Sequence, residues 1–208
     1  DQHDEQADDP IHRRTPTRPV PRNPWAKQFM AADDNRRMEH AFATNGVVPL
    51  SHWGVIRARG ADAARFLHGQ LTSDMLALGP GRAVPAGFCS AKGRLQASFV
   101  VWQGEADEIL LACSASLLAP TLKRLSMFVL RAQCKLSDAT SELALHGLAG
   151  PAALARLGNA QPWECRRSDA ATVIRLPDAQ GLPRALLVGA APLDAPALDA
   201  DTWRWLEV

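Results

Sequence analysis

The chain has 208 residues, of which 47% are hydrophobic and 22% are charged, and its formal net charge at pH 7 is +1. A chain of this length can bury a substantial core. Its balanced charge supplies none of the sustained basic field that attracts nucleic acid or an anionic membrane, and no apolar run approaches the roughly 20 residues that cross a bilayer. We therefore predict a soluble folded protein with no direct nucleic-acid partner and no membrane partner.

The four cysteines and six histidines fall in none of the spacings that hold zinc or form a thioredoxin-like pair. We expect reduced, mostly buried thiols and no metal site made by this chain alone. No basic segment followed by an apolar run and a cleavage site opens the sequence, so no secretory signal is visible. The expected location is the cytoplasm.

Residues 1–32 are predicted to be a flexible tail, because acidic residues, then basic residues, alternate there with prolines and leave little apolar surface to bury. A helix is expected from Asp33, with Met38 and Phe42 one turn apart and Asn45-Gly46 as its stop. The folded domain is predicted to extend over 33–208.

The next segments alternate between strand and helix patterns. We predict strands at 55–60, 83–89, 95–103, 108–114 and 132–138, and helices at 61–75 and 116–130. The first helix would place Phe66, Leu67, Gln70, Leu71 and Asp74 at helical spacing, and the second would pack Leu117, Leu118, Leu122, Leu125 and Phe128. Between 83–89 and 95–103, the sequence SAKG predicts a turn with a glycine at positive φ.

The strand predicted at 95–103 is apolar on both faces. Leu95, Ala97, Phe99 and Val101 would share one face, and Gln96, Ser98, Val100 and Trp102 the other. An interior strand covered on each side has this pattern.

A similar order recurs in the second half. It consists of strands at 142–148, 171–176 and 184–190, a helix at 150–158 that starts with Pro151, and a short helix near 194–200. We therefore predict an α+β fold with a duplicated β/α unit, from element order alone. Composition and spacing show no phosphate loop and no nucleophile elbow, and they indicate no function.

Four segments of the sequence resemble those of a known protein family. GADAARFLHGQLTSDMLAL (60–78), FCSAKGRLQASFVVW (88–102), LKRLSMFVLRAQCKLSD (122–138) and GLAGPAA (147–153) occur in the order and spacing of the YgfZ family, which is related to the glycine-cleavage T-protein, an aminomethyltransferase. The resemblance covers roughly residues 47–208. It implies the duplicated β/α folate-binding domain of the T-protein N-terminal region, in which a cavity holds tetrahydrofolate.

The resemblance also implies where the folate site lies. T-proteins use an aspartate in the strand after the glycine turn, and the matching positions here are Gln96 and Ala97. We therefore predict no catalytic residue. The cysteine and histidine spacings already predict no metal ligand. The predicted folate-binding residues are Phe88, Lys92, Gln96, Ser98, Cys113 and Ser114. Lys92 could attract a folate glutamate tail or an acidic partner, or be an exposed turn lysine, and Cys89 is read as a buried thiol.

Three functions follow from this resemblance. The preferred one is a non-catalytic tetrahydrofolate-binding accessory protein that supports iron–sulfur enzyme maintenance or tRNA modification, with iron–sulfur proteins as partners. One alternative is a folate-dependent aminomethyltransferase with its carboxylate relocated to Asp74, Asp138 or Glu142. The other is an interaction module that has lost folate. Because the family's later phrases do not occur before the sequence ends at DTWRWLEV, we expect the chain to be the N-terminal portion of a longer protein, with a natural short form as the alternative.

Overall fold

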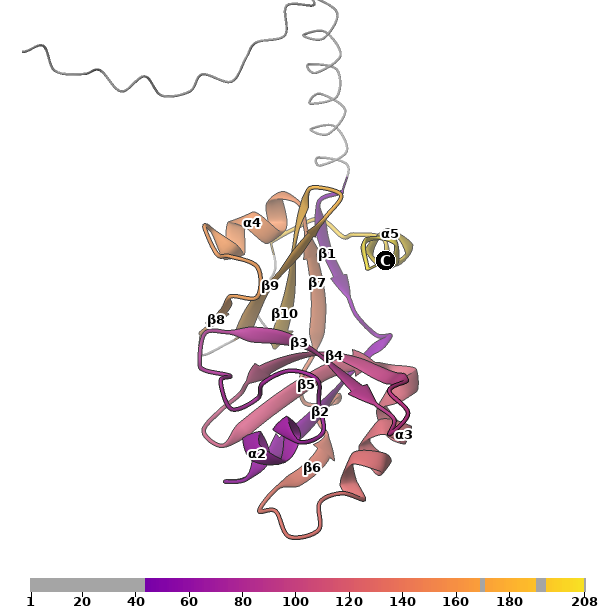
Figure 1. The fold of residues 1–208 in the computed structure, drawn as a ribbon. Coiled ribbons are helices and arrows are strands. Elements are labelled where there is room, and N and C mark those ends of the chain that lie inside the picture. Colours follow the sequence, from indigo (N-terminus) through magenta and orange to yellow (C-terminus); the bar gives the residue numbers. More distant parts are fainter. Residues whose placement is uncertain (1–43, 169–170, 190–193, 208) are drawn as a thin grey trace, which may run out of the picture. The chain divides into compact units, whose positions relative to one another are not determined.

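The computed structural model describes residues 44–168, 171–189 and 194–207 (Figure 1). The predicted tail at 1–32 and most of the helix predicted from Asp33 lie outside these described residues.

The first sheet is antiparallel and has the strand order β3-β4-β5-β2-β6. Its strands are β2 (Trp53–Arg59), β3 (Ala83–Cys89), β4 (Leu95–Gln103), β5 (Glu108–Ser114) and β6 (Lys135–Asp138). Two helices accompany it, α2 (Ala63–His68) and α3 (Ala115–Ser126). The strand β4 lies inside the sheet, as its two apolar faces predict.

The second sheet is also antiparallel and has the order β1-β7-β10-β9-β8. Its strands are β1 (Gly46–Pro49), β7 (Leu145–Ala149), β8 (Cys165–Arg167), β9 (Ala171–Ala179) and β10 (Leu182–Gly189). The helices of this half are α4 (Pro151–Leu157) and α5 (Ala200–Leu206). Thus β1, the first strand of the described residues, belongs to the second sheet (Figure 1).

Three buried clusters hold these layers together. One joins the facing sides of the two sheets, where Val100 and Trp102 of β4 share a core with Ile174 and Leu186. The opposite side of the first sheet packs against α2 and α3, and the opposite side of the second packs against α4. Antiparallel sheets with segregated helices match the α+β class, while the duplication of a folate-binding unit stays a prediction.

The predicted strands at 83–89, 95–103 and 108–114 are confirmed with the same bounds. The helix predicted at 61–75 is wrong in its extent, because α2 ends at His68 and Gly69 follows as its cap. The chain then turns to run beside β3, where Thr72 N donates to the Gly87 carbonyl at 3.0 Å and Leu71 bridges to Phe88. This tertiary pairing ends α2 after six residues, which is less than two helical turns.

The later helices also differ from the sequence predictions. The helix α3 ends at Ser126, so Phe128 lies beyond it and is 49% exposed. The helix predicted near 194–200 is wrong, since α5 begins at Ala200, where the Asp199 carboxylate accepts from Thr202 N at 2.8 Å. Neither β1 nor the three-residue β8 is predicted from the sequence.

Candidate functional site

The hairpin of β3 and β4 contains a β-bulge at Gln96. Phe88 pairs with Ala97 and Cys89 pairs with Leu95, so Gln96 has no opposite residue on β3. A bulge inserts an extra residue and re-aims the side chains near it. The predicted alternation therefore fails at this point: Gln96 lines a hollow with α3, whereas Val100 and Trp102 point into the core between the sheets.

The first hollow beside this bulge has a volume of about 210 Å³ and is here called the inner hollow. Phe88 and Gln96 contribute the hairpin side, and α3 contributes the other side through Leu117, Pro120, Thr121 and Arg124. The Oε1 atom of Gln96 is shielded from solvent and accepts no hydrogen bond from the described residues. An unpaired buried polar atom costs about 1–3 kcal/mol, a cost that a ligand with an N–H or O–H donor would remove.

A second hollow, here called the outer hollow, meets the inner one at Gln96 and Arg124. Its volume is about 630 Å³, and it is lined by Ser90, Ala91, Lys92, Arg94, Leu95, Gln96 and Arg124. The side chains of Lys92, Arg94 and Arg124 form none of the ion pairs found among the described residues. The two hollows together form the hairpin groove, which offers one unpaired acceptor, an apolar wall and a cluster of cations.

The groove brings together three of the six predicted folate-binding residues, Phe88, Lys92 and Gln96. The other three line neither hollow: Ser98 is exposed, Cys113 is 3% exposed within the core, and the Ser114 hydroxyl lies 2.9 Å from that of Ser116. All six assignments stay predictions.

Sequence reasoning missed Arg94 and Arg124 as groove residues. Arg94 could have been found, because it stands just after the glycine turn that holds Lys92. Arg124 could not have been found from the sequence, because its position beside Gln96 depends on how α3 packs against the hairpin.

The carboxylates considered for a relocated catalytic role lie elsewhere. Asp74 accepts from the backbone of Leu76 and lies 3.1 Å from His68 Nδ1, Asp138 accepts from Thr140 N, and Glu142 pairs with Arg57. Among the described residues that line the hairpin groove, none is acidic.

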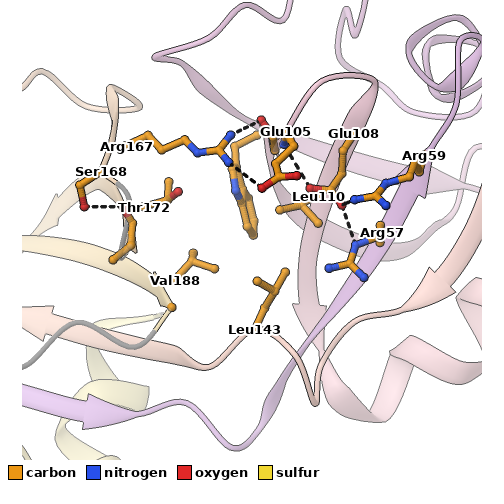
Figure 2. Close-up of a pocket in the computed structure, with 14 residues that line it drawn as sticks. Arg57, Arg59, Glu105, Glu108, Leu110, Leu143, Arg167, Ser168, Thr172 and Val188 are labelled. Atoms are coloured by element: carbon orange, nitrogen blue, oxygen red, sulfur yellow. Dashed lines mark hydrogen bonds and ion pairs between the residues drawn. The ribbon is translucent and has the colours of Figure 1, made fainter.

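A different cavity, of about 240 Å³, lies between the two sheets (Figure 2). Trp102 and Leu110 of the first sheet and Thr172 and Val188 of the second contribute to its walls, and Leu143 lies at its base. Its volume falls below the roughly 300–1,000 Å³ of typical small-molecule sites.

Charged side chains surround this inter-sheet cavity, and they neutralise one another (Figure 2). The buried Glu108 carboxylate lies 2.6 Å from Arg57 Nε and 3.1 Å from Arg59 Nη2. Arg57 Nη1 also meets Glu142 Oε2 at 2.5 Å, and the hydrogen bond to Glu142 is the main reason that the pKa of Arg57 is raised.

Across the cavity, Arg167 of β8 donates to the Gly104 carbonyl at 2.5 Å and lies 3.4 Å from Glu105. This contact joins the turn between β4 and β5 to the second sheet. Because each of the three arginines already has an anionic or carbonyl partner, we interpret the inter-sheet cavity as a structural junction and the hairpin groove as the candidate site.

Two of the four thiols, those of Cys113 and Cys165, are buried. Burial raises the pKa of the thiols of Cys113 and Cys165 to about 11, so both are protonated at neutral pH. Over the described residues, no group of three or more His, Cys, Asp or Glu is placed to hold a metal ion. No helix in that same part of the chain has the length and apolar character to cross a membrane.

Two antiparallel sheets packed face to face, with a groove beside a bulged hairpin, define the chain as an α+β domain with a candidate small-molecule site. Residues 17–173 match the GCVT N-terminal domain family. The chain therefore belongs to that family.

Similar proteins carry two kinds of name. An aminomethyltransferase of Bacillus pumilus is 30% identical over 108 residues, which are 52% of this chain and 30% of that protein. The tRNA-modifying protein YgfZ of Photorhabdus laumondii is 37% identical over 49 residues, or 24% of this chain and 15% of that protein. The chain thus spans less than a third of each of these curated relatives.

The fold is also that of a solved structure. The glycine cleavage system aminomethyltransferase T of Bartonella henselae superposes with a TM-score of 0.60 over 72% of this chain and 44% of that one. The sequence identity is 17%, so this likeness shows the fold alone.

Proposed function

We propose that this domain binds tetrahydrofolate in the hairpin groove without catalysing aminomethyl transfer, and that it acts as an accessory protein. The observation that carries the proposal is Gln96: its Oε1 atom is buried without a partner at the bulge of β4, in a groove rich in unpaired cations.

The residues of the groove fit a folate. Gln96 would accept an N–H of the ligand, and Phe88 and Leu117 would contact its apolar faces. The carboxylates of the glutamate moiety would be attracted to Lys92, Arg94 and Arg124. When bound, tetrahydrofolate supplies a carrier for one-carbon units.

The residue at position 96 argues against catalysis of aminomethyl transfer by the described residues. Aminomethyl transfer develops positive charge on an amine, and a preorganised carboxylate is the group that stabilises such charge. Gln96 is neutral, and the described groove residues include no acid.

We further propose that the accessory role concerns iron–sulfur enzyme maintenance or tRNA modification, with iron–sulfur proteins as partners. This part of the proposal is supported by the resemblance of the 88–102 segment to YgfZ proteins and by similarity to a tRNA-modifying relative. It is independent of the folate chemistry and needs its own genetic test.

The second candidate is a folate-dependent aminomethyltransferase. It is favoured by the longer similarity to proteins that bear this name, such as 131 residues at 30% identity to the Parafrankia aminomethyltransferase. In that case a carboxylate outside the described groove would have to approach Gln96.

An anaerobic calorimetric titration of the 208-residue chain with tetrahydrofolate tests the proposal. We expect saturable binding, and no turnover when an aminomethyl donor is added. Binding with turnover would favour the second candidate. The absence of binding would overturn both and leave an interaction module.

A further inference from the structure

We propose that the turn after α3 is a docking surface for a partner protein whose contact face has an apolar pocket rimmed by carboxylates. This turn surface consists of six exposed side chains: Lys123, Met127, Phe128, Leu130, Arg131 and Lys135. None of the six lines the hairpin groove. The inference therefore goes beyond folate binding and does not depend on it.

The first argument is that apolar side chains gather on this turn. Met127 is 68% exposed, Phe128 is 49% exposed and Leu130 is 85% exposed, although only four positions separate the first from the last. Leu130 is the most exposed large apolar residue in the described part of the chain. Single exposed apolar side chains are ordinary, whereas a group of them marks an interaction site. Met and aromatic residues are also enriched at protein interfaces.

The second argument is that the fold itself leaves these side chains exposed. Val129, between them in sequence, is partly buried and packs against the core of the first sheet. Leu130 N donates to the Phe128 carbonyl at 3.0 Å. At the base of the turn, Gln133 N donates to the Asp62 carboxylate at 2.7 Å. Because Val129 takes the position toward the core, the apolar side chains on either side of it remain available to a partner.

The third argument is that the charge beside these side chains has one sign. Residues 109–137 contain four cations and no Asp or Glu. Three of these cations, Lys123, Arg131 and Lys135, belong to the turn surface, and they take part in none of the ion pairs found among the described residues. Unpaired cations beside exposed apolar groups are complementary to an apolar pocket with an acidic rim.

The same charge decides between three kinds of occupant. In a two-fold dimer a patch faces its own copy, so the cations of one chain would meet those of the other. An anionic membrane is attracted by a sustained basic field, whereas the formal net charge of this chain is only +1. An acidic face on a partner protein needs complementary charge only over the contact itself. The acidic partner face is therefore the occupant that the observations favour.

The test is photo-crosslinking of the full chain in its native cells, with p-benzoylphenylalanine in place of Leu130. We expect a crosslink to one partner protein, which mass spectrometry identifies and which binds the full chain when purified. Leu154 is the matched control position, because it is a leucine of α4 with 48% exposure and lies outside the turn surface. The same product should not form there. A product made of two copies of the chain, a lipid adduct, or no product at position 130 would overturn the proposal.

Charge variants then test the acidic rim with the purified partner. Lys123→Glu/Arg131→Glu should weaken its binding about tenfold or more at low salt, and the loss should shrink as ionic strength rises. Arg82→Glu is the matched control, because Arg82 is exposed, lies outside the turn surface and forms none of the ion pairs of the described residues. Binding that withstands the double variant, or that Arg82→Glu weakens equally, would overturn the proposal.

Tetrahydrofolate titration of the same variants separates this inference from the proposed function. We expect Lys123→Glu/Arg131→Glu to bind tetrahydrofolate as the wild type does, because neither residue lines the hairpin groove. A wild-type chain that docks its partner but binds no tetrahydrofolate would support the turn surface and overturn the folate proposal alone. Loss of tetrahydrofolate binding in the double variant would overturn the independence of the two surfaces.

Discussion

Gly147 of β7 leaves the space that the indole ring of Trp203 fills. A β-carbon at position 147 would come within 2.7 Å of three carbons of that ring, and Trp203 is fully buried in the cluster between the sheets. Because glycine has no side chain, the indole of Trp203 packs directly against β7, and this contact holds α5 against the second sheet.

Gly147→Ala should therefore lower the free energy of unfolding by about 1–3 kcal/mol, the usual cost of overpacking a core. Urea denaturation followed by tryptophan fluorescence measures it. Gly79→Ala is the control, because a β-carbon there would meet nothing within 4 Å. Equal stability of the Gly147 variant and wild type would mean that α5 shifts freely, contrary to the packing described.

Gln96→Met removes the unpaired acceptor but keeps the length of the side chain. Tetrahydrofolate affinity should fall about tenfold, the value of one neutral hydrogen bond, while the stability of the free protein should not decrease, because a buried unpaired atom is lost. Calorimetry and urea denaturation give the two readouts. Ser98→Ala serves as comparison: an equal loss of affinity there would show that the site extends beyond the hairpin groove.

Glu108→Gln tests the junction between the sheets. The carboxylate is buried beside Arg57 and Arg59, and its Oε2 atom also accepts from Glu105 N at 3.2 Å. Arg57 keeps its ion pair with Glu142 in this variant. We therefore expect the free energy of unfolding to fall by about 2–3 kcal/mol, less than the roughly 3–5 kcal/mol lost when a buried charge is left without any partner. Glu105→Gln, on a side chain that is 71% exposed, should change stability by less than about 0.5 kcal/mol. Similar effects of the two variants in denaturation would contradict this ranking.

The thiols of Cys113 and Cys165 should resist alkylation in the native state. With pKa values of about 11, only about one thiol in a thousand is ionised at pH 8, and the thiolate is the reactive form. Iodoacetamide labelling followed by mass spectrometry should leave both unmodified until denaturant is added. Rapid native labelling of Cys113 would instead place it at an accessible site, as the sequence prediction requires.

The sequence was sufficient for the hairpin that carries the candidate site. Alternating apolar residues on both faces of 95–103 and the SAKG turn mark β3 and β4 without tertiary information. The bulge at Gln96 was not predictable, because it appears only in the pairing of Phe88 and Cys89 with the neighbouring strand.

Other parts of the fold are decided by distant contacts. The end of α2 depends on Thr72 and Leu71 pairing with β3, and the strand β1 exists through pairing with β7, far along the chain. Local sequence propensity does not predict which distant strand a segment will pair with. The groove has the same origin, since Arg124 is brought to Gln96 by the packing of α3.

The place of β1 in the second sheet has a consequence for biosynthesis. Gly46 pairs with Ala149, so at about 5–20 residues per second the ribosome releases β1 roughly 5–20 s before its partner strand. The first sheet is complete only near the end of that interval, once β6 has been made, and Val100 and Trp102 then still lack the second half of their shared core. Until the second sheet forms, the nascent chain exposes the apolar face around Val100 and Trp102 and the unpaired edge of β1. Exposed apolar surfaces and strand edges of this kind are what chaperones at the ribosome exit bind.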